Sequence, residues 1–196
     1  LSVAFLLNAV AILAAIASQA LHGFDRYEIG VYVRELLVLD MLGFAFLIAL
    51  FMFIHAVSPN MYLGFFICVI IVVVNGFVWG LMDIDSNMVK LGGTPSYTVS
   101  DLYGYKPYAP GLSWFHTYWM LFAGLLGVAA VCLWPRGKES GFFKRLDLAA
   151  QEWKNYRWAG IGVFLIWLCT AGFTFYNTRM LNPTVSGDEQ ERRQIR

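Results

Sequence analysis

The chain has 196 residues, of which 59% are hydrophobic and only 14% are charged, with a formal net charge of +1. Ordinary soluble domains have about a quarter of their residues charged, so this composition argues against a water-soluble domain and favours a lipid environment. With so few cations, a nucleic-acid-binding surface is also unsupported, and nucleic acid is not an expected partner.

Five windows are apolar enough and long enough to cross a bilayer, whose hydrocarbon core of about 30 Å needs about 20 helical residues. In chain order they are residues 1–21, 36–56, 61–82, 112–134 and 158–177. The predicted fold class is therefore all-α, a polytopic membrane helical bundle with about five transmembrane helices within residues 1–178.

Because the sequence begins in an apolar run and stops in a charged one, we expect a piece of a longer protein. Residues 179–196 would then be a linker to a further C-terminal domain.

Two of the polar residues inside these windows are candidates for a substrate path. Asp40 lies about one turn inside the second window, and Asn75 lies deep in the third. Polar and ionisable groups at membrane depth often line substrate paths, so both residues are candidates for such a path. Arg34 and Glu35 shortly precede Asp40, so a hydrated cluster at the membrane surface is the alternative for that carboxylate.

The segment between the third and fourth windows includes residues 92–111, GGTPSYTVSDLYGYKPYAPG. Its prolines restrict the backbone and its glycines permit tight turns. Its tyrosines can rest their rings on the membrane interface with the hydroxyls in water. We expect a compact outer cap, which either anchors the loop alone or serves domain docking or substrate gating. Its candidate residues are Tyr97, Asp101, Tyr103, Tyr105 and Tyr108.

Residues 135–157 have a higher density of cations than the other segments between windows. The six are Arg136, Lys138, Lys144, Arg145, Lys154 and Arg157. Cytoplasmic loops carry an excess of Lys and Arg, so this segment is predicted to be cytoplasmic. Residues 22–35, residues 83–111 and the C-terminus would then lie on the extracytoplasmic side.

Within that segment, residues 142–154 show the pattern of an amphipathic helix. Apolar residues recur at helical spacing on one face, and charged residues fall opposite them. We expect an interfacial helix at the cytoplasmic membrane surface, either a simple connector or a docking helix for a cytoplasmic partner. The candidate docking residues are Phe142, Lys144, Arg145 and Trp153.

The sequence carries no recognisable catalytic motif. It has no His-Glu-x-x-His, no Gly-x-Ser-x-Gly and no Walker loop, so whether the whole protein is an enzyme is left open. His22 and His116 are expected at the outer level of the membrane, where two axial imidazoles could hold a haem. His55 is expected at the inner level. The three cysteines lack Cys-x-x-Cys spacing and are predicted to be small buried hydrophobic residues.

Four segments occur in an order that resembles a known group of bacterial membrane proteins. They are YLGFF (62–66), GGTPSYTVSDLYGYKPYAPGLSWFHTYW (92–119), CLWPRG (132–137) and GFTFYNTRMLN (172–182), followed by a tail rich in Glu, Arg and Gln. The group joins an ABC-2 type transporter permease region to a C-terminal domain of the M1 zinc aminopeptidase family. The resemblance is strongest from residue 53 to residue 196.

The resemblance implies that the chain is the end of the permease region, in the bacterial inner membrane. Residues 175–182 would lead out of the last span to an extracytoplasmic peptidase domain. A separate cytoplasmic ABC ATPase subunit would be the partner that hydrolyses ATP. No cofactor is expected within this segment, and zinc would belong to the peptidase domain. A structural membrane anchor without transport, or a haem-binding redox subunit, are the alternatives.

Overall fold

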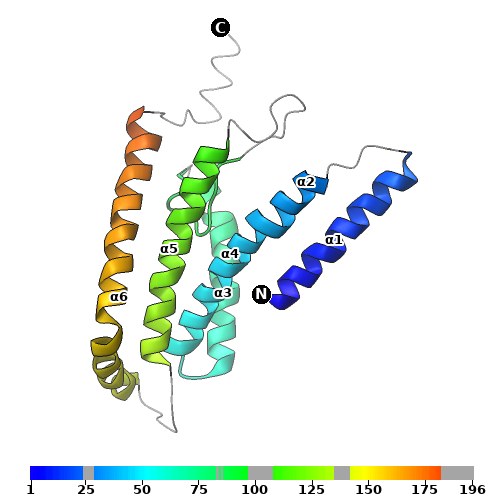
Figure 1. Cartoon of the computed structure of the whole chain (residues 1–196). Coiled ribbons are helices and arrows are strands. Elements are labelled where there is room, and N and C mark those ends of the chain that lie inside the picture. Colours follow the sequence, from blue (N-terminus) through cyan, green and yellow to red (C-terminus); the bar gives the residue numbers. More distant parts are fainter. Residues whose placement is uncertain (24–28, 83, 85, 97–107, 135–141, 182–196) are drawn as a thin grey trace.

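The computed structural model describes residues 1–23, 29–82, 84, 86–96, 108–134 and 142–181, except for the side chains of residues 35, 36, 142–145, 179 and 181. This part of the chain is all-helical (Figure 1). Five helical stretches are long and apolar enough to cross a membrane, which confirms the predicted fold class at this level. They are α1 (Ser2–Leu21); the run α2 (Ile29–Tyr32), η1 (Val33–Leu39) and α3 (Asp40–Val57); α4 (Met61–Leu81); α5 (Ala109–Leu133); and α6 (Phe142–Tyr176), which a short π-helix, η2 (Asn177–Leu181), extends.

A three-residue turn joins α3 to α4. The Ser58 backbone is extended, as expected before a proline, and α3 ends there. The Asn60 Oδ1 atom accepts a hydrogen bond from the Leu63 amide at 2.8 Å, which caps the first turn of α4. Gly64 lets the two helices approach, because a Cβ atom at Gly64 would lie 2.5 Å from His55 Nδ1.

Aromatic side chains of α3 and α5 form the core of the bundle. Phe46 is 2% exposed, and its ring centroid lies 5.0 Å from that of Trp119. Tyr118 stacks on Trp167 of α6 at 5.6 Å, so the same cluster also joins α5 to α6. Cys68 adds a buried residue from α4. Offset and edge-on ring pairs such as these stabilise a core beyond the area that they bury.

The structure differs from the sequence prediction at α6. Residues 142–154 were expected to form a helix separate from the last span, but they continue directly into it. Gly160 is the first glycine after residue 142, and the helix lacks proline, so nothing in the local sequence stops it at residues 155–157.

The prediction of three buried cysteines also needs correction. Cys68 and Cys132 are buried, whereas Cys169 is exposed on α6. The prediction was wrong for Cys169 because its apolar surroundings in the sequence do not show which side of the helix packs on the bundle.

The helices alternate in direction (Figure 1). The ends of α3 and α5 and the beginnings of α4 and α6 lie at one end of the bundle, which we call the turn end. The opposite end, called the loop end, holds the last turns of α1, α4 and α6 and the first turns of α2 and α5. Helix α1 lies at the edge beside α2, η1 and α3, and Asn8 is its one buried residue.

Large apolar side chains cover much of the outer surface. On α4, Tyr62 is 81% exposed and Phe77 is 70% exposed, and on α6 Leu165 is 54% exposed. Water does not favour so much exposed apolar surface, whereas lipid tails do. The bundle is therefore compatible with a bilayer, as the composition predicted.

Candidate functional site

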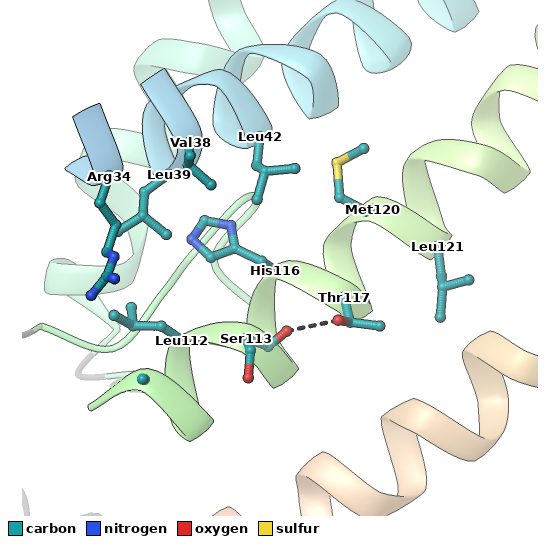
Figure 2. Close-up of a pocket in the computed structure, with 11 residues that line it drawn as sticks. Arg34, Val38, Leu39, Leu42, Leu112, Ser113, His116, Thr117, Met120 and Leu121 are labelled. Carbon is teal, nitrogen blue, oxygen red and sulfur yellow. Dashed lines mark hydrogen bonds between the residues drawn. The ribbon is translucent and has the colours of Figure 1, made fainter. Parts of the chain in front are cut away.

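A cleft lies at the loop end of the bundle, between η1 and α3 on one side and α5 on the other (Figure 2). Its volume is about 690 Å³, which falls within the range of roughly 300–1,000 Å³ that is usual for small-molecule sites. We call it the η1–α5 cleft. Its lining residues are Arg34, Val38, Leu39, Leu42, Ala109, Leu112, Ser113, His116, Thr117, Met120 and Leu121.

The polar groups of this cleft are few. Ser113 Oγ donates to the Pro110 carbonyl at 2.9 Å, and Thr117 Oγ1 donates to the Ser113 carbonyl at 2.7 Å. Both hydroxyl protons are thus engaged by the backbone of their own helix. The guanidinium of Arg34 and the imidazole of His116 are the ionisable groups among the lining residues. In Figure 2 Arg34 lies at one end of the cleft, and Met120 and Leu121 lie at the other.

One wall of the cleft is formed by η1, a seven-residue π-helix. π-Helices account for well under 1% of residues in proteins and commonly mark functional sites, because the wider turn leaves a local distortion that other contacts must offset. Arg34, Val38 and Leu39 belong to this segment and line the cleft. The unusual backbone and the cleft therefore coincide.

A second polar feature holds the loop after α4 inside the bundle. Asn75 of α4 receives a hydrogen bond from the Leu91 amide at 2.9 Å and donates to the Leu91 carbonyl at 3.2 Å. Its Oδ1 atom also accepts from Trp79 Nε1 at 2.7 Å. The side-chain amide thus replaces the backbone partner that Leu91 would have in a helix or sheet.

Residues 86–96, here called the docked segment, make further contacts with α5 and α3. Trp119 Nε1 donates to the Gly93 carbonyl at 2.9 Å. Gly92 has a positive φ of 69°, and a Cβ atom there would lie 3.3 Å from a ring carbon of Phe46. A larger residue at Gly92 would therefore meet both backbone strain and the aromatic core.

The structure gives different positions to the candidate path and cap residues. Asn75 is half-buried and bonded to the docked segment. Asp40 is exposed at the start of α3, and it is not among the residues that line the η1–α5 cleft. Tyr108 is exposed just before α5. The remaining cap candidates, Tyr97, Asp101, Tyr103 and Tyr105, lie outside the described residues.

The candidate docking residues lie at the start of α6. The side chains of Phe142, Lys144 and Arg145 lie outside the described part, although their backbone is helical. Trp153 packs against its own helix, since a Cβ atom at Gly160 would lie 2.7 Å from its ring. It also lines an apolar cleft of about 540 Å³ between α5 and α6, here called the α5–α6 cleft. Trp153 thus contributes to the packing of α6 at the turn end.

The histidines do not share a site in the described structure. His22 Nδ1 lies 2.7 Å from the Ser18 carbonyl of α1, whereas His116 lies in the η1–α5 cleft, which has no lining residue from α1. His55 packs beside Gly64 at the turn end. Within the described ranges, no three His, Cys, Asp or Glu side chains are grouped so that they could hold a metal ion.

Sequence reasoning did not find the η1–α5 cleft or the docked segment. Arg34 and His116 are 82 positions apart, and the packing of α3, which continues from η1, on α5 brings them to one cleft. One signal was available for the docked segment. An asparagine and a tryptophan one turn apart in an apolar window, Asn75 and Trp79, need hydrogen-bond partners at that depth.

Comparison of the chain with protein-family models, with curated proteins and with solved structures found no match. The resemblance of the four ordered segments to permease–peptidase proteins therefore stays a prediction.

Proposed function

We propose that the chain is the permease-like membrane region of an ABC-2-type transporter and that it anchors an extracytoplasmic M1-type zinc aminopeptidase domain. The observation that carries the membrane part is the set of five helices long and apolar enough to cross a bilayer, with large apolar side chains on their outer faces. The transporter and peptidase parts depend on the ordered resemblance of residues 62–182. Zinc would be bound in the peptidase domain.

The proposed location is the bacterial inner membrane, with the turn end in the cytoplasm. The six cations of residues 135–157 support this orientation through the positive-inside rule. Since η2 follows α6 at the loop end, the C-terminus would be extracytoplasmic. A peptidase domain attached there would act outside the cytoplasm.

The start of α6 is the proposed contact for a cytoplasmic ABC ATPase. Leu146, Ala149 and Trp153 line the α5–α6 cleft, so an apolar side of this helix packs toward the bundle. The cationic residues Lys144 and Arg145 lie in the first turn of α6, and they are the candidates for contact with an acidic surface of the ATPase. A charge-mediated contact of this kind affects both association and specificity.

This proposal is tested by reversing the two charges in the full-length protein. We expect Lys144→Glu combined with Arg145→Glu to lower ATPase recovery at least fivefold in co-purification from membranes. The matched control is Lys154→Glu with Arg157→Glu, which makes the same charge change further along the same helix. Equal recovery of the ATPase with the wild-type protein and with both variants would contradict the proposed contact.

A structural anchor without transport is the second candidate, and the bonding of Asn75 favours it. The amide of Asn75 is engaged by Leu91 and Trp79, which leaves less of it available to line a substrate path. The two candidates differ when residues 1–178 are replaced by one unrelated membrane span. A permease loses its ATP-dependent phenotype in this exchange, whereas a structural anchor can be exchanged without loss of any ATP-dependent phenotype.

A further inference from the structure

The η1–α5 cleft spans two depths of the proposed membrane. The helical run Ile29–Val57 has 29 residues, whereas about 20 cross the hydrocarbon core. If Val57 marks one edge of the hydrocarbon core, about 20 residues of helix reach back to Val38 at the other edge. Arg34 then lies about one turn outside the core, at headgroup level. The same count back from Leu133 reaches Trp114, which places His116 at the edge of the core.

The cleft is lined mostly by apolar side chains, and its one permanently charged lining residue lies at one end of this direction. Arg34 lies at the headgroup end, while Met120 and Leu121, which follow His116 on α5, lie toward the core (Figure 2). Arg34 already has an interaction within the protein. Its guanidinium presents five N–H donors in a planar fork, so it can bind phosphate oxygens in addition to that contact.

We propose that the η1–α5 cleft binds an acidic phospholipid, with the phosphate at Arg34 and an acyl chain along Leu42, Met120 and Leu121. Charge complementarity selects the acidic headgroup, and the depth of the cleft matches the headgroup–chain boundary. The π-helical wall supports a binding role, since such segments recur at functional sites. This inference depends on the membrane placement proposed above, but it requires neither transport nor an ATPase.

The test is a lipid titration of the purified full chain in detergent, followed by native mass spectrometry. The probes are dioleoyl phosphatidylglycerol, dioleoyl phosphatidylcholine and inorganic phosphate. We expect the wild-type protein to bind phosphatidylglycerol about tenfold more tightly than phosphatidylcholine. Arg34→Gln should remove this preference, whereas Arg157→Gln, which alters an exposed arginine of α6, should preserve it.

A second variant tests the apolar end of the cleft. Leu42→Trp fills the chain-binding region and should weaken binding of both lipids at least fivefold, while Leu165→Trp on the exposed side of α6 should not. Equal affinity of the wild-type protein for the two lipids would overturn the proposal, as would unchanged phosphatidylglycerol binding by Arg34→Gln or Leu42→Trp. Displacement of phosphatidylglycerol by equimolar inorganic phosphate would identify a site for a free anion and would equally overturn it. If one of the two cleft variants fails to fold, as gel filtration would detect, the other variant and the lipid preference of the wild-type protein decide the test.

Discussion

At the scale of single residues, Asn75 links α4 to a segment 16 positions away. Its side chain satisfies both the amide and the carbonyl of Leu91. A backbone that leaves its helix near lipid must find such partners, because unpaired polar groups there are costly. A polar residue inside an apolar helix therefore has a structural explanation here.

Replacing Asn75 with leucine should destabilise the bundle. The substitution leaves two backbone groups of Leu91 and the Trp79 indole without this partner, and we expect a loss of about 1–3 kcal/mol in the free energy of unfolding. Asn177→Leu is the matched control. The Asn177 side-chain amide donates to the carbonyl of Phe173 in its own helix, so this substitution does not detach a distant segment. Thermal unfolding in detergent measures both. Equal melting temperatures for the two variants would contradict the role assigned to Asn75.

Two glycines of α4 should respond differently to substitution by alanine. A Cβ atom at Gly64 would lie 2.5 Å from His55 Nδ1, so Gly64→Ala should destabilise the protein by about 1–3 kcal/mol through overpacking. Gly76 has no such neighbour within 4 Å, so Gly76→Ala should be neutral or stabilising by up to about 1 kcal/mol. Chemical unfolding of both variants measures the difference, and a stabilised Gly64→Ala protein would disprove the close contact between α3 and α4.

At the scale of elements, α6 extends the last predicted span toward the α5–α6 cleft. Trp153 is 43% exposed and packs near Gly160, while Trp158 is 74% exposed. We expect Trp153→Ala to lower the free energy of unfolding by about 1–2 kcal/mol, and Trp158→Ala to change it by less than about 0.5 kcal/mol. Thermal unfolding of the two variants measures this. A larger loss of stability in Trp158→Ala than in Trp153→Ala would contradict the packing described for the first half of α6.

The helices could be predicted from sequence because each depends on a local run of apolar residues. The windows at 61–82 and 112–134 differ from α4 and α5 by a few residues at their ends. The continuity of α6 was missed because the last span was predicted from its apolar window alone, and Glu152, Lys154 and Arg157 lie before that window although charged residues are compatible with a helix. The π-helix η1 was missed as well, since its hydrophobic pattern does not distinguish it from an α-helix.

The candidate site was much less predictable. Asn75 was identified as an unusual residue, but its partner Leu91 depends on how the docked segment folds back onto α4. The η1–α5 cleft depends on the packing of two helices distant in the sequence. Periodicity shows which side of a helix is apolar, but it does not show where two such sides fail to meet.

At the scale of the whole molecule, the bundle has a compact part and a peripheral part. Helices α3, α5 and α6 share the aromatic cluster around Trp119 and Trp167, whereas α1 packs at the edge of the bundle against η1 and α3. Five helices that cross a bilayer would place the α3–α4 turn on one side and the start of α5 on the other, and this arrangement is the central claim.

That central claim is tested most directly by labelling with a membrane-impermeant maleimide in intact spheroplasts. In a background without Cys68, Cys132 and Cys169, single cysteines are introduced as Pro59→Cys in the turn, Tyr108→Cys before α5 and Met180→Cys after α6. We predict that the cysteines at 108 and 180 react in intact cells, and that the cysteine at 59 reacts only after permeabilisation. Reaction of all three cysteines in intact cells, or of the one at 59 alone, would contradict the account.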